Sequence, residues 1–168
     1  RRVLFRSHAN PALWHPALRN KSETVIAALA ESGGMLGFSL YPHHLRGGGT
    51  CTLAAFCEMV ARTAERHGVA CLGIGSDLCQ DQPDSVVEWM RTGRWTMAVD
   101  HGEGSADAPG FPPMPAWFAG NADFPTLARG LHDIGFSEAE VGALMGGNWA
   151  RFFEAGFGPA EALPDAAE

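Results

Sequence analysis

The sequence predicts an α/β fold built on a parallel sheet, and three observations lead to this prediction. Short apolar runs of strand length alternate with stretches whose apolar residues recur at helical spacing. The strand candidates are continuously apolar, as in parallel sheets that are covered on both faces. Polar side chains stand just past these strands, where α/β proteins collect their chemistry. The pattern is typical of either a doubly wound sheet or part of a (β/α)8 barrel.

The expected elements follow in the order strand, helix, strand, helix, strand, and two further helices. The strands cover residues 3–7, 35–41 and 69–76, and the helices cover residues 22–31, 52–67, 123–132 and 137–153. Ser22 begins the first helix, Gly33-Gly34 ends it, and Gly68 closes the second. Ser137-Glu138-Ala139-Glu140 is a capping-box-like start for the last helix.

The chain is expected to form one domain over residues 1–158, followed by a polar tail over residues 159–168. Within the domain, residues 78–122 are rich in proline, glycine and tryptophan. This segment is too long for an ordinary connection, so we expect a structured loop over a site. Three strands in 168 residues cannot close a barrel, which needs about 200 residues or more.

Composition and charge narrow the classes of function. Twelve basic against nineteen acidic residues give a net charge of −7, which disfavours nucleic acid and anionic membrane surfaces as partners. No apolar run approaches the ~20 residues of a membrane span, and we expect no signal peptide. The four cysteines (Cys51, Cys57, Cys71 and Cys79) include no C-x-x-C pair. We therefore expect free thiols in a reducing, cytoplasmic compartment.

The chain has no initiator Met and opens inside the apolar run Val3-Leu4-Phe5. We therefore expect it to be a portion of a longer protein.

Candidate site residues follow the expected strands or lie in the loops after them. His8 and Asp77 each come directly after a strand, whereas Arg19 and His43-His44 lie in loops. Each has a structural alternative, because a strand-end histidine is often a hydrogen-bonded structural residue, an aspartate can cap a segment, and loop arginines and histidines are often solvated. There is no H-E-x-x-H motif and no Cys/His cluster with zinc spacing. These residues alone indicate only an α/β protein with a polar rim.

A set of motifs runs in one order from about residue 3 to residue 154. The motifs are Ser7-His8-Ala9-Asn10 with His15-Pro16 and Arg19-Asn20, Ala30-Glu31-Ser32-Gly33-Gly34-Met35-Leu36-Gly37 followed by Tyr41-Pro42, Gly73-Ile74-Gly75-Ser76-Asp77, Asp123-Phe124-Pro125-x-Leu127, Gly135-Phe136-Ser137-Glu138, and Gly146-Gly147-Asn148-Trp149-x-Arg151-Phe152. The first resembles the Ser-His-Ser-Asn … His-Pro-Arg-Asn segment of renal (membrane) dipeptidases. The Gly-Ile-Gly-Ser-Asp motif and the last motif are similar to two further segments of that family. The sequence therefore resembles the C-terminal part of these zinc metallopeptidases.

The resemblance implies a fold, a reaction and a role for each site residue. The fold is the C-terminal part of a (β/α)8 barrel, with about three βα units and C-terminal helices. The reaction is dipeptide hydrolysis at two zinc ions that share a bridging hydroxide. His8 matches a ligand of the second zinc, Arg19 the residue that binds the substrate carboxylate, and Asp77 the residue that passes a proton to the leaving amine. His44 matches a substrate-binding position at the rim of the site, and the family also admits a homodimer.

Departures from the family pattern keep other functions open. The remaining zinc ligands of the family belong to an N-terminal half that this sequence lacks. Cys79 stands where the family has a second aspartate, residues 56–60 lack its Asp-His-x-x-His stretch, and Arg6 replaces an apolar residue. One alternative is a non-catalytic relative that has lost its metals. Another is an amidohydrolase-type enzyme acting on a different small amide, because fold does not determine substrate.

Overall fold

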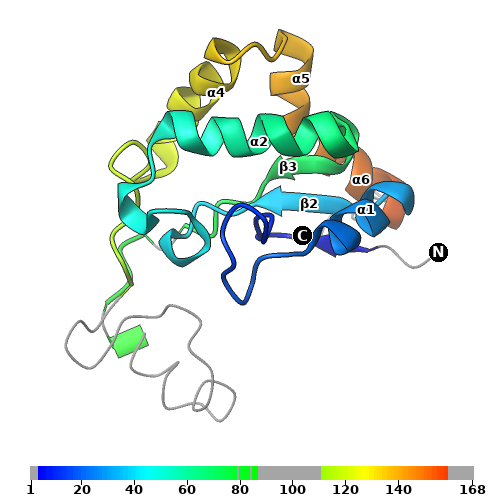
Figure 1. Ribbon diagram of the computed structural model, residues 1–168. Coiled ribbons are helices and arrows are strands. Elements are labelled where there is room, and N and C mark those ends of the chain that lie inside the picture. The colour runs from blue at the N-terminus through cyan, green and yellow to red at the C-terminus, as the bar shows by residue number, and fades with distance from the viewer. Residues whose placement is uncertain (1–3, 79, 84, 87–110, 159–168) are drawn as a thin grey trace, which may run out of the picture.

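The computed structural model describes residues 4–78, 80–83, 85–86 and 111–158. Strands β1 (Phe5–Arg6), β2 (Met35–Phe38) and β3 (Leu72–Ile74) form a parallel sheet in the order β1-β2-β3 (Figure 1). Phe5 lies opposite Met35, and Leu36 lies opposite Leu72. The predicted α/β class with a parallel sheet is confirmed.

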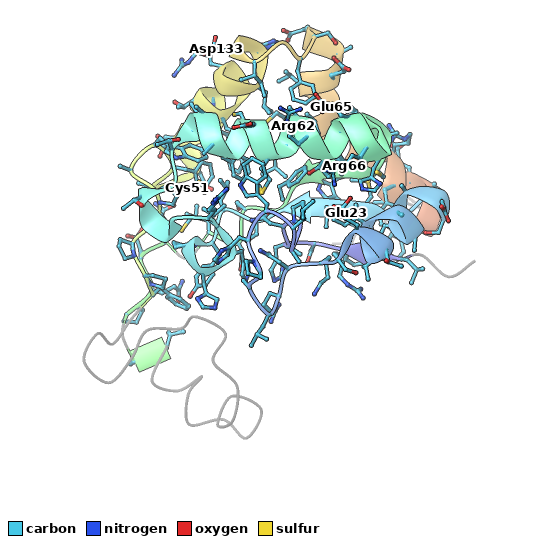
Figure 2. All side chains as sticks on the ribbon, in the orientation of Figure 1. Glu23, Cys51, Arg62, Glu65, Arg66 and Asp133 are labelled. Carbon is cyan, nitrogen blue, oxygen red and sulfur yellow. The ribbon has the colours of Figure 1, made fainter. Side chains whose placement is uncertain are left out.

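Helices cover the sheet and extend beyond it. They are α1 (Glu23–Glu31), α2 (Leu53–His67), α4 (Phe124–Asp133), α5 (Glu138–Gly142) and α6 (Asn148–Phe157). In Figure 1, α2 lies along the sheet, and α4 and α5 lie on the side of α2 away from β2. An ion pair joins α2 to α1, because Arg66 Nη1 donates to Glu23 Oε2 at 3.0 Å (Figure 2). Among the described residues, no helix combines the length and the apolarity needed to cross a bilayer.

The helix ends lie where the local sequence predicts them. Ser22 and Thr52 cap α1 and α2, each accepting a hydrogen bond from a backbone N–H three residues on. Gly68 ends α2 with φ +76, a conformation that glycine adopts without steric cost. At α5 the predicted capping box forms, because Ser137 N–H donates to Glu140 Oε2 at 2.9 Å and Glu140 N–H donates to Ser137 Oγ at 3.4 Å.

All three predicted strands are shorter in the structure. The strand predicted over residues 69–76 is limited to Leu72–Ile74, because residues Val69–Cys71 form a 3-10 turn. Residues 3–7 were expected to be buried, yet β1 holds only Phe5 and Arg6, and Phe5 is 39% exposed. Within the described sheet β1 is an edge strand with β2 as its neighbour, so less of it is covered. The strand predicted to reach residue 41 ends at Phe38, because the N–H and C=O of Ser39 bond to the side chain of Asn10.

The last predicted helix is wrong as a single element. A π-helical segment (Ala143–Gly147) separates α5 from α6, and Gly146 leaves helical geometry there. Two adjacent glycines weaken a helix, since each loses more backbone entropy than other residues. The break brings α6 against β3, where Trp149 Nε1 donates to the Ile74 carbonyl at 3.0 Å.

The core lies between the sheet and the helices. Its largest fully buried side chains are Phe38, Phe56, Phe118, Ile26, Met35, Leu36, Leu40, Leu45, Met59, Leu72, Leu127 and Leu131. Cys51, Cys57 and Cys71 are buried free thiols, and burial raises the pKa of Cys57 to about 12. The free thiols predicted for these three are confirmed, whereas Cys79 and the tail over residues 159–168 lie outside the described residues.

Candidate active site

Three of the predicted site residues meet at one edge of the sheet. His8 follows β1 and Asp77 follows β3, and the carboxyl ends of parallel strands share an edge. His8 Nε2 lies 3.9 Å from Asp77 Oδ2 and 3.1 Å from Arg19 Nη2. The side chains of His8 and Asp77 are 30% and 33% exposed, so a ligand could reach both.

The contacts of His8 determine which ring nitrogen carries the proton. A guanidinium can only donate, so Nε2 accepts a hydrogen bond from Arg19. Nδ1 lies 2.8 Å from Ser7 Oγ and therefore carries the proton. The lone pair of Nε2 thus faces the rim.

Asp77 has a backbone conformation that is uncommon outside glycine. Its φ is +52°, in the left-handed region that aspartate tolerates better than most residues. Such conformations cost about 1–3 kcal/mol and occur often at active sites. The preceding strand end is closely packed, because a Cβ on Gly75 would overlap the Ser7 carbonyl. Asp77 therefore leaves the sheet next to the segment that carries His8.

His44 is buried behind this group. It is 3% exposed, and its ring lies nearly parallel to that of His8, with centroids 6.5 Å apart. Its Nδ1 lies 2.8 Å from Ser39 Oγ. Burial, followed by the positive charges of Arg19, His8, His43 and Lys21, lowers the pKa of His44 to about 4. His44 is therefore a neutral imidazole at pH 7, and its substrate-binding role remains a prediction.

Two asparagines that sequence reasoning did not select connect the segments of the rim. These are Asn10 and Asn20. Asn10 N–H donates to Asn20 Oδ1 at 2.9 Å, and Asn10 Nδ2 donates to the carbonyls of Ser39 and His44 at 3.0 and 3.1 Å. The signal for them was their place in the sequence, two residues after His8 and directly after Arg19.

The loop between the two asparagines is closed at its base. Lys21 N–H donates to the Asn10 carbonyl, and Ala12 N–H donates to the Lys21 carbonyl, both at 2.8 Å. Burial, followed by the charges of Arg6 and Arg19, lowers the pKa of Lys21. The base of the loop therefore has a positive potential, although the net charge of the chain is −7.

The described end of the proline-rich segment packs close to the rim. The ring of Phe111 lies 6.3 Å from that of Tyr41, and Trp117 Nε1 donates to the Cys51 carbonyl at 2.7 Å. Most of the segment predicted to form a loop over the site lies outside the described residues.

The donor atoms at the rim fit part of a metal site. An imidazole nitrogen and a carboxylate oxygen are ligands that zinc accepts, and the side chains of His8 and Asp77 are both partly exposed. A metal ion at His8 Nε2 would take the place of the hydrogen bond from Arg19. A zinc site needs about three or four protein ligands. Among the described residues, no group of three or more His, Cys, Asp or Glu side chains is placed to hold a metal. The rim therefore fits one edge of a metal centre and not a complete one.

Comparisons with known proteins locate this fold among hydrolases. No family model matches the sequence, and no curated protein matches it. Among solved structures, an amidohydrolase from Pseudomonas aeruginosa aligns with a TM-score of 0.80 and 25% identity, over 95% of this chain and 47% of that protein. Dipeptidase AC, a metallopeptidase of family M19, aligns with a TM-score of 0.67 and 21% identity, over 93% of this chain and 38% of its own.

A metallopeptidase from Rhodobacter sphaeroides, solved with a phosphinate mimic of the dipeptide L-Ala-D-Ala, aligns with a TM-score of 0.65 and 21% identity, over 90% of this chain and 35% of its own. The chain thus spans less than half the length of each of these three proteins. The resemblance to metallo-dipeptidases is confirmed at the level of the fold.

Proposed function

We propose that this chain is the substrate-recognition part of a metal-dependent dipeptidase, built as the C-terminal part of a (β/α)8 barrel. The observation that carries the proposal is the meeting of His8, Arg19 and Asp77 at one edge of a parallel sheet. The likeness of the fold to an amidohydrolase and to metallopeptidases supports a hydrolase. Because the chain spans less than half the length of these proteins, we place the remaining metal ligands in another part of the enzyme.

His8 is the residue that would hold a zinc ion. Its Nδ1–H is directed to Ser7 Oγ, as is usual for metal-bound histidines, and its Nε2 would exchange the hydrogen bond from Arg19 for the metal. Zinc, when bound, supplies Lewis-acid polarisation of the scissile carbonyl. The chain's own part in this step is to present one neutral imidazole in a single tautomer.

Arg19 and Asp77 would act on the two ends of the substrate's reacting residue. The planar guanidinium binds a carboxylate through two parallel hydrogen bonds, and Lys21 adds positive potential beside it. Asp77 lies close to His8 and would pass a proton to the amine that leaves. The free carboxylate and the leaving amine belong to the same residue, so Arg19 and Asp77 together would recognise the C-terminal residue of a dipeptide.

A second function is favoured by the likeness to an amidohydrolase at 25% identity. In this alternative the same groups act on another small amide, and Cys79 in place of a family aspartate is compatible with a changed substrate. A non-catalytic relative is the third alternative.

Hydrolysis assays on the complete enzyme of which we propose this chain is a part, supplied with zinc, separate these functions. The substrates are dipeptides with a free C-terminal carboxylate, the same dipeptides amidated, and unrelated small amides. We expect turnover of the free-carboxylate dipeptides that is lost on chelation and in His8→Ala and Asp77→Asn. Turnover of unrelated amides alone would favour the amidohydrolase. A zinc-loaded protein that cleaves none of them would rule out both enzymes.

A further inference from the structure

Each polar atom of the Asn20 side chain has a hydrogen-bond partner, in a cluster of buried polar residues that also contains Asn10, Ser39 and His44. It is 7% exposed, and its Oδ1 accepts the Asn10 N–H at 2.9 Å. Its Nδ2 donates to the carbonyls of His15 and His44 at 2.8 and 3.0 Å. One amide therefore ties together the start of the loop, the middle of the loop and the segment after β2.

The residue before Asn20 is the arginine that reaches the rim. Arg19 and His8 are eleven residues apart in sequence, yet Arg19 Nη2 lies 3.1 Å from His8 Nε2. An arginine side chain loses up to about 2 kcal/mol of conformational entropy when it is held in one position. Because the Asn20 side chain fixes the backbone directly after Arg19, fewer conformations of the Arg19 side chain are available, and the guanidinium is more often at the rim.

We propose that Asn20 is a positioning residue for carboxylate recognition by Arg19. Its buried amide holds the backbone from which Arg19 extends to the rim beside His8 and Asp77. Without that amide the loop base loosens, and the guanidinium no longer meets the substrate carboxylate in the productive place. This inference rests on the proposed function and adds to it a residue that touches neither substrate nor metal.

A second buried asparagine provides a matched control. Asn148 is 1% exposed, and its Nδ2 donates to the carbonyls of Val69 and Leu72 at 2.8 and 2.7 Å. Like Asn20, it makes two amide N–H bonds to buried carbonyls. It does so at the start of β3, however, whereas the rim lies beyond the end of that strand. Loss of Asn148 should lower stability without moving Arg19.

The kinetic test compares Asn20→Ala and Asn148→Ala in the complete enzyme of which we propose this chain is a part. For Asn20→Ala we expect kcat/KM for free-carboxylate dipeptides to fall by roughly ten- to a hundredfold, the scale of an ångström-sized misplacement. Amidated dipeptides, which offer no carboxylate, should be affected little. Asn148→Ala should leave the ratio between the two substrates unchanged. In an Arg19→Lys background, Asn20→Ala should cause little further loss of kcat/KM, because both changes weaken the same interaction with the substrate carboxylate.

A test that does not need activity uses side-chain ¹⁵N NMR of the 168-residue chain. We expect His8 in the wild type to be the Nδ1–H tautomer, with Nε2 accepting from Arg19. Asn20→Ala should shift the His8 nitrogen signals, and Asn148→Ala should not. If Asn20→Ala is too unstable to study, Asn20→Ser replaces it with the same expected direction.

The two tests distinguish failure of the inference from failure of the proposed function. Unchanged His8 signals together with unchanged substrate discrimination in Asn20→Ala would overturn the positioning role. A parallel loss of discrimination in Asn148→Ala would also overturn it, because the effect would then follow stability. If the His8 signals respond as expected but the wild type cleaves no dipeptide, the inferred placement of Arg19 holds and only the dipeptidase function fails.

Discussion

The guanidinium of Arg19 carries five N–H donors in one plane, and its contact with His8 uses Nη2. At the same rim, His44 is buried without charge, and Lys21 has a lowered pKa. His44 is therefore neutral at pH 7, whereas Arg19 stays charged and can bind a carboxylate through two bonds at once. The next two predictions, on Arg19 and on His44, depend on this difference in charge.

Arg19→Lys should lower kcat/KM for free-carboxylate dipeptides by roughly 1–3 kcal/mol, the scale of a charged hydrogen bond. Lysine keeps the charge but offers a point donor in place of two parallel ones. Amidated substrates should be poor already and should hardly respond. Steady-state kinetics of both substrates on both proteins provide the check, and equal rates on the free-carboxylate substrate would remove Arg19 from the site.

His44 should make the folded chain less stable as the pH falls. Its pKa is 6.5 when unfolded and about 4 when folded, so the unfolded state binds the proton first. Stability should therefore fall from about pH 6.5 down to pH 4, by up to about 3 kcal/mol, and by about 2 kcal/mol at pH 5. Urea unfolding of wild type and His44→Gln at pH 7 and pH 5 measures this. If both proteins lose the same free energy, the buried neutral imidazole is not the cause.

Between elements, Trp149 of α6 packs closely on two glycines of the sheet, Gly37 and Gly73. A Cβ on Gly73 would lie 2.6 Å from Trp149 Nε1 and 2.8 Å from its Cδ1, so one of the two must move. Trp149 Nε1 also donates to the Ile74 carbonyl, which limits how far the ring can shift. The glycine in β3 is therefore required by the helix that covers it.

Gly73→Ala should destabilise the chain by about 1–3 kcal/mol, the usual cost of overpacking. The matched change is Gly142→Ala in α5, where an added Cβ meets no atom within 4 Å and the backbone is helical. That variant should gain about 0.4–1 kcal/mol, because it lowers the entropy of the unfolded chain. Urea unfolding of the wild type, Gly73→Ala and Gly142→Ala measures these changes in stability. A Gly73→Ala variant as stable as the wild type would contradict the close packing of Trp149 on Gly73.

Helix starts could be predicted from the sequence more reliably than strand ends. The caps at Ser22, Thr52 and Ser137 depend on residues within three positions, so a local motif identifies them. The end of β2 depends instead on Asn10, which lies 29 residues before Ser39. No pattern of apolar residues contains that contact, and the predicted strand was consequently too long.

At the scale of the whole molecule, the sheet ends at a partly exposed edge. Phe5 in β1 and Phe153 and Phe157 in α6 are 39%, 43% and 77% exposed. The rings of Phe5 and Trp149 meet edge to face, and Trp149 stacks on Phe153. An apolar surface therefore runs from the strand edge along α6.

The purified 168-residue chain alone should not hydrolyse dipeptides. One histidine and one aspartate at the rim cannot hold a dinuclear centre, which needs several protein ligands and the groups that orient them. The assay is amino-acid release from dipeptides with and without added zinc, using wild type and His8→Ala. Turnover that depends on zinc and is absent in His8→Ala would show that the described residues suffice.

Sequence reasoning could predict His8, Asp77 and Arg19 as site residues, but it could not predict Asn10 and Asn20. His8 and Asp77 were accessible to sequence reasoning because strand ends in a parallel sheet share an edge, and that edge is where they lie. Arg19 was selected through the family motif, since its loop position alone favours a solvated residue. Asn10 and Asn20 were missed because burial of an amide is decided by which carbonyls the folded chain brings to it.

The hydrogen bonds between Asn10, Ala12 and Lys21 close the base of the loop. The distance between His8 and Arg19 therefore does not depend on how many residues the loop contains. His8 and Arg19 are held together at the base, whereas Leu13 and Leu18 within the loop are 69% and 70% exposed. Doubling the length of a loop costs only about 0.6 kcal/mol in closure entropy. The loop tip around Leu13 and Leu18 can therefore change in length or sequence while the contact between His8 and Arg19 stays the same.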